Sequence, residues 1–513
     1  ILPSETLAPI MDPATGEIRA VDLIPQVSGD DREVPLLLEG ATVRGFNDVV
    51  FGIERREGPD GEIVLVCTSP PVAGMVMTKT YTFSPGSYLA RLEIEMRNGA
   101  SRVTVGHPES GWGIGWQGGF YNPEPVSRLT GQVQAIAARE GDLRTKTLKL
   151  GDEPYTLTGP IAWAGQQKKY FAAVLVPAPG TDVTSVEVSV RGKNITPEYR
   201  SRRGIPEPMS VVMNHPGVEL APGGELRAEY ALFVGPKDYE VLKTALPAMA
   251  EGSLPLSRVA FGQMIWGMDW IRPISIFLLW ALRYFEALVH NWGTAIIVLV
   301  LVVKTVLYPL SHWAIKNQAR TMAEQQKIKP FVEELNTKYK DDPAKKSQEL
   351  MKLYREHNIN PLGALRGCFP MLLQMPIFFG LYILLDQAVE LRGQPFLWVH
   401  DLSMPDRLLP FGFTLPLVGW DALNLLPLLM AGTQYITSRM MMSSISDPMQ
   451  KQIMVMMPIM FTMMLYNMPA GLMLYWTVQN IWQIGHTALT KRYVATHEAS
   501  PPVAAAGAAG KGR

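Results

Sequence analysis

The apolar stretch Gly293–Trp313, GTAIIVLVLVVKTVLYPLSHW, constrains this chain more than any other segment. It is long enough to cross a bilayer, because about 20 apolar residues span the hydrocarbon core. One side chain within it, Lys304, is charged. A lone lysine deep inside such a helix costs roughly 2.5–3.5 kcal/mol on insertion scales. The sequence therefore predicts a membrane span whose lysine faces a compensating polar environment.

Four more apolar runs follow and predict further spans, although the second and third of them are short. They cover Phe369–Val389, Leu423–Thr437, Gln452–Tyr466 and Ala470–Leu489. Residues 314–360 are polar with helical periodicity, and they predict a helical hairpin with ten Lys/Arg against seven Asp/Glu. The positive-inside rule places this hairpin, the loop Ser438–Lys451 and the C-terminus in the cytoplasm. Five spans then place the N-terminal region outside the cytoplasm.

Residues 1–255 show alternating apolar and polar side chains interrupted by Pro and Gly, a pattern typical of antiparallel strands. The clearest segment follows the turn SPGS. Its apolar side chains Ala90, Leu92, Ile94 and Met96 alternate with the charged Arg91, Glu93, Glu95 and Arg97. Many short strands predict an extracytoplasmic, periplasmic β-sandwich domain. No targeting segment precedes Ile1, so we expect that one has been removed or omitted.

Residues 256–292 are predicted to contain a linker and an amphipathic helix. Within 273–292, three polar side chains, Arg283, Glu286 and His290, recur on one helical face. We expect this helix to lie in the membrane interface. The alternative is a true span, which would move the β domain to the other side. The membrane core then covers 293–493, and the low-complexity tail 494–513 is predicted to be disordered.

Several function classes are disfavoured. The net charge is 0 and no long basic block is present, which argues against binding of DNA or RNA. No zincin, serine-hydrolase or P-loop motif occurs, so we expect no enzyme, nucleotide, cofactor or metal. Gly113, Gly115 and Gly118 match GxGxxG, but no βαβ pattern surrounds them. His107 and His215 are isolated.

The predicted spans are unusual because they contain polar side chains. Amides and a hydroxyl accompany Lys304 as candidate neighbours: Gln374, Gln387, Gln434, Thr477, Gln479, Asn480 and Gln483. They indicate a water-accessible cavity. Two alternatives remain open: Lys304 snorkels to the cytoplasmic surface, or each amide only joins neighbouring helices. The segment Met430–Met473 contains thirteen methionines, which suit lipid-facing, core or variable apolar contacts.

Several blocks of sequence, taken in the order in which they occur, resemble a known family. They are VKTVLYPLS, the charged hairpin, NPLGALRGCFPMLLQMPIFFGLY, VELRGQPFLWVHDLS, SDPMQKQIMVMMPIMF and MPAGLMLYWTVQN. They resemble the YidC branch of the YidC/Oxa/Alb3 membrane protein insertases. The strands KTYTFSPGSYLARLEIEMRN and GQQKKYFAAVLVPAP are similar to the large periplasmic domain of Gram-negative members.

The resemblance implies a five-helix core with a hydrophilic groove that opens to the cytoplasm and to lipid. Lys304 takes the position of the family's groove arginine, and Val300 that of a groove threonine. The family's contact positions in the last helix align with Tyr475 and Trp476. The triplet Ala364–Leu365–Arg366 resembles an insertion, and members of this type usually begin with an N-terminal anchor that is missing here.

The predicted function is insertion of newly made membrane proteins into the inner membrane, alone or beside the Sec translocon. The predicted contacts with the substrate are Lys304, Gln374, Gln434, Tyr475, Trp476, Gln479 and Asn480. The expected partners are nascent membrane proteins, the ribosome, the Sec translocon and the lipid bilayer. The rival hypotheses are a transporter with a polar pore and an envelope assembly scaffold that acts through its β domain.

Overall fold

A computed structural model gives the architecture. It describes the following residues: 10–11, 18–19, 36–99, 101–107, 111–117, 134–139, 142–146, 152–190, 209–244, 271–309, 331–332, 334–335, 337–339, 343–356, 363–413, 415, 420–442 and 448–497. The chain divides into two compact units. The first, here the β unit, comprises Ile1–Arg272 with Gln387–Gly393, and the second, the helical unit, comprises Pro273–Asp386 with Gln394–Arg513.

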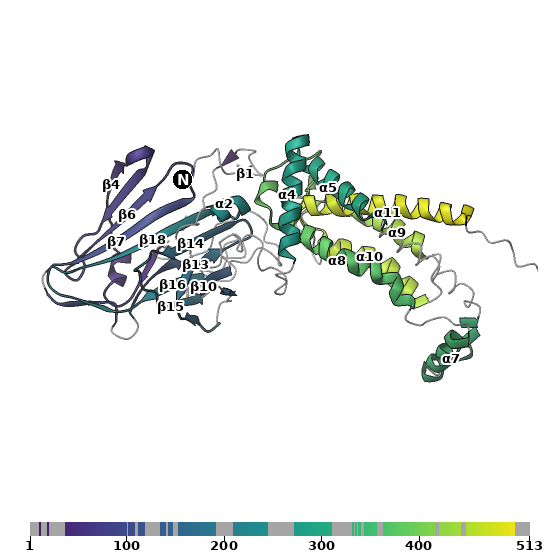
Figure 1. Cartoon of the computed structure of the whole chain (residues 1–513), viewed down its shortest axis with the longest axis horizontal. Coiled ribbons are helices and arrows are strands. Elements are labelled where there is room, and N and C mark those ends of the chain that lie inside the picture. Colours follow the sequence, from purple (N-terminus) through teal and green to yellow (C-terminus); the bar gives the residue numbers. More distant parts are fainter. Residues whose placement is uncertain are drawn as a thin grey trace, which may run out of the picture. The chain divides into compact units, whose positions relative to one another are not determined.

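Within the β unit, antiparallel strands form two large sheets (Figure 1). The nine-stranded sheet has the order β11-β10-β13-β14-β18-β7-β6-β5-β4 and the five-stranded sheet the order β12-β15-β16-β9-β3. The strands of the first are β4 Gly52–Glu57, β5 Ile63–Thr68, β6 Met75–Phe83, β7 Leu89–Asn98, β10 Gln134–Arg139, β11 Asp142–Lys146, β13 Ile161–Gln167, β14 Phe171–Pro177 and β18 Glu225–Pro236. Those of the second are β3 Leu37–Glu39, β9 Trp112–Gln117, β12 Tyr155–Thr158, β15 Ser185–Val190 and β16 Met209–His215.

Smaller elements complete this unit. They are the pair β8 Val103–Val105 with β17 Val218–Leu220, the pair β1 Ile10–Met11 with β2 Ile18–Arg19, the turns η1 Arg44–Asn47, η2 Pro59–Gly61 and η3 Val389–Leu391, and the helix α2 Tyr239–Thr244.

Both large sheets contribute side chains to one apolar core, so the predicted β-sandwich is confirmed. Ile94 and Tyr230 enter it from the larger sheet, and Ile114 and Val211 from the smaller. On β7 the predicted alternation holds, since Ala90, Leu92, Ile94 and Met96 are buried while the intervening charged residues are exposed or half-buried. The period of 2 in the sequence is sufficient to assign the two faces of such a strand.

The GxGxxG match has a structural explanation in the described residues. Gly113 and Gly115 lie inside β9, which pairs with β16, rather than in a strand-to-helix turn. A Cβ atom on Gly115 would lie 2.1 Å from the Val211 carbonyl oxygen, so only glycine permits this approach. Gly118 lies outside the described residues. The two described glycines therefore serve strand pairing.

His215 is a buried core histidine with both ring nitrogens in hydrogen bonds. Its Nδ1–H donates to the Asp182 carbonyl oxygen at 2.6 Å, so Nε2 accepts from the Tyr230 hydroxyl at 2.8 Å. The ring also stacks on Trp112, with 4.5 Å between centroids. Burial lowers the pKa of His215 to about 4, because the apolar surroundings disfavour imidazolium.

We predict that the β unit loses stability in acid because of His215. The unfolded imidazole titrates near its ordinary pKa of about 6.5, whereas the folded one stays neutral down to about pH 4. Between these values only the unfolded state binds the proton, so stability falls as pH falls, by up to about 1.4 kcal/mol per pH unit. Thermal unfolding of the full chain in detergent, followed by tryptophan fluorescence from pH 7.5 to 4.5, measures this loss. The variant His215→Gln should flatten the profile, and an unchanged pH dependence in it would exclude His215 as the cause.

Six described helices of the helical unit coincide with the amphipathic segment and the five apolar segments of the sequence (Figure 1). They are α4 Arg272–Val289, α5 Trp292–Val306, α8 Gly363–Gln387, α9 Leu425–Met442, α10 Pro448–Leu465 and α11 Ala470–His497. The Asn291 side chain caps α5 by accepting from the Thr294 amide, which sets its start near the predicted Gly293. The helix α7 Pro343–Glu356 begins at the proline predicted to open the second half of the hairpin.

Three predicted boundaries differ from the structure or lie outside the described residues. Helix α11 runs to His497, so residues 494–497 of the predicted disordered tail are helical, as an extension of the last predicted span. The triplet Ala364–Arg366, which resembles an insertion before the block GCFP, lies in the first turn of α8. Residues 310–330 are not described, so the end of the predicted span at Trp313 and the first part of the hairpin lie outside the described residues.

Among the described helices, none is both long enough and apolar enough to cross a membrane.

Candidate functional site

The centre of the candidate site is a small cavity between α5, α8 and α11. Its lining residues are Val300, Val303, Lys304, Leu307, Ile377, Leu381, Tyr475 and Gln479. The volume is about 10 Å³, which matches roughly one water molecule. Lys304 and Tyr475 are buried, with 7% and 2% of their surfaces exposed. The cavity therefore places one cation, one phenol and one amide within a mostly aliphatic wall.

The helical repeat explains which side chains reach this cavity. On α5, positions 300, 303, 304 and 307 follow the i, i+3, i+4, i+7 spacing of one face. On α11, Tyr475 and Gln479 are four residues apart and line the cavity together. Val300 is part of the wall, so a methyl-bearing surface stands where the family resemblance places a threonine.

Lys304 is an unpaired cation within the part of the chain that the structure describes. None of the cavity-lining side chains is a carboxylate. A buried ammonium without a counter-ion retains an unmet demand for an acceptor, which costs several kcal/mol until water or an anionic group supplies it. The cavity therefore favours an incoming carboxylate or carbonyl oxygen.

Trp476 and Asn480 lie on the next face of α11, about 100° from Tyr475 and Gln479. The Trp476 ring packs edge-on against Phe378, with 5.1 Å between centroids, and also contacts Phe461 at 5.7 Å. The Asn480 amide donates to the Thr433 hydroxyl at 3.2 Å and approaches the Met430 carbonyl at 3.5 Å. The Trp476 ring therefore joins α11 to α8 and α10, whereas the Asn480 amide joins α11 to α9, as expected for an amide that links helices.

The remaining predicted polar residues lie elsewhere. Gln434 is half-buried on α9 and does not line the cavity. Gln387 is the last residue of α8, and its contacts group it with the β unit. Thr477 donates to the Met473 carbonyl of its own helix. The side chain of Gln374 lies outside the described residues, so its predicted contact is not located.

The aliphatic residues of the wall were not among the predicted site residues. Val303 and Leu307 share the helical face of Lys304, and the periodicity of α5 was a sufficient signal for them. Ile377 and Leu381 come from α8, and their register against α5 is not encoded in any local pattern.

Apolar side chains are exposed on two neighbouring helices. On α10 the exposed ones are Val455, Met456, Met457, Ile459, Met460, Met463 and Met464. On α9 they include Leu428, Leu429 and Ile436. Methionine fills varied apolar contacts because its chain is flexible and polarisable. This surface suits lipid or a passing apolar segment.

Helix α4 runs across the direction of α10 and α11 (Figure 1). Its Ser275 hydroxyl donates to the Gly380 carbonyl of α8 at 3.1 Å. Its exposed face carries the aromatic series Phe277, Trp280 and Tyr284, in which successive rings stack at 6.1 Å. Such an aromatic face is typical of helices that lie at a membrane surface.

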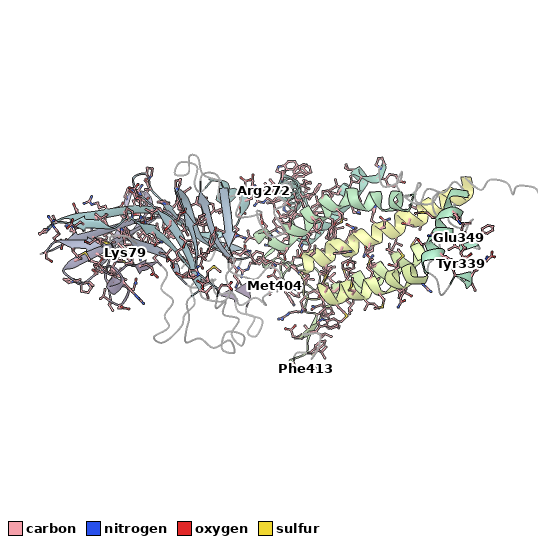
Figure 2. All side chains as sticks on the ribbon, turned by 90° about the horizontal axis from the view of Figure 1, so that it is seen from below. Lys79, Arg272, Tyr339, Glu349, Met404 and Phe413 are labelled. Atoms are coloured by element: carbon pink, nitrogen blue, oxygen red, sulfur yellow. The ribbon has the colours of Figure 1, made fainter. Side chains whose placement is uncertain are left out.

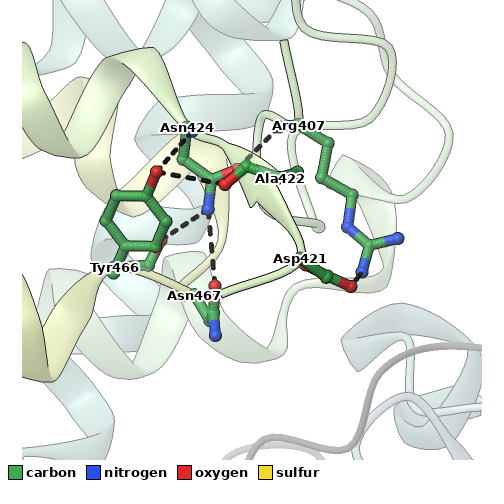
Figure 3. A network of polar contacts seen from close by, with 6 residues as sticks. All are labelled: Arg407, Asp421, Ala422, Asn424, Tyr466 and Asn467. Atoms are coloured by element: carbon green, nitrogen blue, oxygen red, sulfur yellow. Dashed lines mark hydrogen bonds and ion pairs between the residues drawn. The ribbon is translucent and has the colours of Figure 1, made fainter. Parts of the chain in front are cut away.

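A polar network fixes the end of the helical unit where α9 begins and α10 ends (Figure 3). The Asn424 side chain donates to the Tyr466 carbonyl at 2.8 Å and accepts from the Arg407 amide at 3.1 Å. The Tyr466 hydroxyl accepts from the Asn424 amide and donates to the Ala422 carbonyl. The network therefore ties the loop before α9 to the turn after α10.

Sequence comparison identifies the family. Residues 284–497 match the family described as 60Kd inner membrane protein, and residues 40–271 match the family described as YidC periplasmic domain. The membrane protein insertase YidC of Syntrophobacter fumaroxidans is 35% identical over 430 residues, which cover 83% of this chain and 70% of that protein. The chain belongs to the YidC family of membrane protein insertases. The YidC insertase of Pelobacter propionicus is 33% identical, with 84% of this chain and 72% of the relative covered.

A crystal structure of an active YidC insertase superposes with a TM-score of 0.34 and 17% identity, covering 86% of this chain and 84% of that one. The assignment to the YidC family rests on the sequence matches rather than on this superposition. One family match covers most of the β unit and the other covers most of the helical unit. Both belong to the same kind of protein, an inner-membrane insertase with a periplasmic domain.

Proposed function

We propose that this YidC family member inserts newly made membrane proteins by receiving a polar segment of each client at the Lys304 cavity. The observation that supports this most directly is the buried cation, which lacks a counter-ion among the cavity-lining side chains. A client segment with an acidic side chain supplies that counter-ion. The cost of desolvating the client's polar groups falls because Lys304, Gln479 and Tyr475 replace part of their water.

The apolar part of the client leaves along the exposed surface of α9 and α10. Partition of its apolar side chains into lipid drives this step, at about 25 cal/mol per Å² of apolar surface removed from water. No nucleotide is required for such partition. The described helices and the predicted spans together form the proposed multi-pass core, whose charged hairpin meets the ribosome on the cytoplasmic side and which works alone or beside the Sec translocon.

The proposed orientation follows the charge distribution of the loops. The segment Ser438–Lys451 and the C-terminus lie in the cytoplasm, and the β unit lies in the periplasm. Helix α4 lies in the outer interface with its aromatic face toward the headgroups. The proposed client contacts are Lys304, Gln479 and Tyr475, which share the cavity, with Gln374, Gln434, Trp476 and Asn480 further along the path.

The deletion of residues 1–250 separates an insertase from an assembly scaffold that acts through its β domain. We expect the truncated protein to retain insertion of a model client in proteoliposomes, because the cavity-lining residues all belong to the helical unit. A full-length protein with Lys304→Glu serves as the control with slowed insertion. Protease resistance shows whether the truncated protein is folded. If it is folded but inactive, the β domain carries the function and the proposal fails.

A further inference from the structure

An apolar hairpin projects from the helical unit between α8 and α9. Its strands are β19 Leu409–Pro410 and β20 Ala422–Leu423. The side chains of Leu409 and Phe413 are 58% and 63% exposed. Figure 2 shows Phe413 at the end of a segment that extends away from the helices. Large apolar side chains exposed together on a projecting segment indicate a contact surface.

The distribution of charge along this hairpin is sharply divided. From Leu408 to Trp420 the sequence contains no charged residue. The residues on either side, Arg407 and Asp421, form an ion pair at the base. An uncharged stretch of sequence between the two members of an ion pair matches the polarity change from the acyl chains of a bilayer to its headgroups.

Several contacts hold the base of the hairpin to the helical unit. The Phe411 amide donates to the Asp421 carbonyl at 2.9 Å, and the Leu415 amide to the Trp420 carbonyl at 2.7 Å. Trp420 stacks on Tyr466, with 3.7 Å between ring centroids. Tyr466 is also part of the network drawn in Figure 3, so the stack connects Trp420 to Asn424.

The exposed side chains of Leu409 and Phe413 favour lipid over a protein partner. They lie on a projecting segment rather than in a groove (Figure 2), and a fluid bilayer accepts projecting apolar side chains without a preformed complementary surface. The hairpin is also continuous with an apolar helix surface, because α9 begins at Leu425, two residues after β20, and exposes Leu428 and Leu429 near its start. Aromatic and aliphatic side chains of this kind dominate the buried faces of interfacial anchors.

We propose that the exposed side chains of Leu409 and Phe413 insert into the adjacent bilayer leaflet, at the boundary between headgroups and acyl chains. Arg407 and Asp421 stay at headgroup level, and the network at Asn424 transmits the depth of these side chains to the start of α9. The hairpin thus sets the height of α9 in the membrane. This contact with lipid does not depend on client insertion, so it stands or falls separately from the role of Lys304.

Depth-dependent fluorescence quenching tests the proposal on the full chain. An environment-sensitive dye is attached at position 409 through Leu409→Cys, in a background with Cys67→Ser and Cys368→Ser. The protein is reconstituted in phosphatidylethanolamine–phosphatidylglycerol vesicles that contain lipids with a nitroxide high in the acyl chain. A second labelled variant, Phe413→Cys, covers the possibility that one substitution disturbs folding. Ile53→Cys is the matched control, since Ile53 is 70% exposed and apolar but lies in the β unit.

We expect most of the fluorescence at positions 409 and 413 to be lost with the nitroxide lipid, together with a blue-shifted emission, and little change at position 53. Quenching by a nitroxide deep in the acyl chain should be weaker. Emission typical of water at both hairpin positions, without lipid quenching, would overturn the proposal. A blue-shifted emission that lipid does not quench would also overturn it, because it would identify a protein contact instead.

Discussion

Replacing Lys304 by glutamate is expected to slow client insertion at least about tenfold, whereas Lys304→Arg keeps insertion near the original rate. A unit charge attracts an opposite charge about 6 Å away by roughly 3 kcal/mol at an effective dielectric constant of about 20, and glutamate reverses the sign. A change of 1.4 kcal/mol already corresponds to about tenfold. Complementation in cells depleted of the native protein and insertion into proteoliposomes both measure the effect.

Two controls separate charge from folding in this series. Lys304→Met keeps the length of the side chain without the charge and should give an intermediate rate. A client whose acidic residues are replaced by lysine should be inserted better by the Lys304→Glu protein than the original client is. If Lys304→Glu supports insertion as well as Lys304→Arg does, charge attraction between Lys304 and the client is excluded as a cause of insertion.

The second large effect is structural. Asn424→Ala is expected to destabilise the helical unit by about 2–5 kcal/mol. The substitution leaves the Tyr466 carbonyl without the amide donor at 2.8 Å and the Arg407 amide without its acceptor at 3.1 Å. Each buried polar group left without a partner costs about 1–3 kcal/mol. Thermal unfolding of the full chain in detergent measures the change.

Asn467→Ala provides the matched control for this network. Asn467 is exposed and accepts only a long hydrogen bond of 3.4 Å from Asn424. Its replacement should change stability by no more than about 0.5 kcal/mol. Equal losses from Asn424→Ala and Asn467→Ala would show that the buried network contributes little. A selective loss would confirm that it holds the loop before α9 to the end of α10.

The sequence predicted the elements of the fold better than their contacts. Alternation on β7 assigned Leu92 and Ile94 to the core, because the two faces of a strand follow from parity alone. The end of α11 was predicted too early, since the composition of 494–497 did not distinguish a polar helical extension from a tail. Local patterns therefore located strands and helices, whereas helix ends depended on what lies beside them.

The candidate site was predictable in part for a related reason. Charge within an apolar run was enough to select Lys304 as its centre. The residues Gln479 and Asn480 were equivalent in sequence, yet one lines the cavity and the other bonds to α9. Neighbours on a helix point about 100° apart, so only one of the two can face Lys304. The packing of α11 against α5 and α9, which no local pattern encodes, made that choice.

Photo-crosslinking from the cavity wall shows most directly whether the client reaches Lys304. A photoreactive amino acid replaces Val303, which lines the cavity and leaves Lys304 in place, and a second protein carries it at Thr305, whose side chain is exposed on the same helix. A ribosome-stalled client is then presented at successive chain lengths. We predict that position 303 crosslinks the acidic segment of the client while it is being inserted, and that position 305 yields lipid adducts and little client. Client crosslinks from position 305 with none from position 303 would contradict a role of the Lys304 cavity in receiving the client.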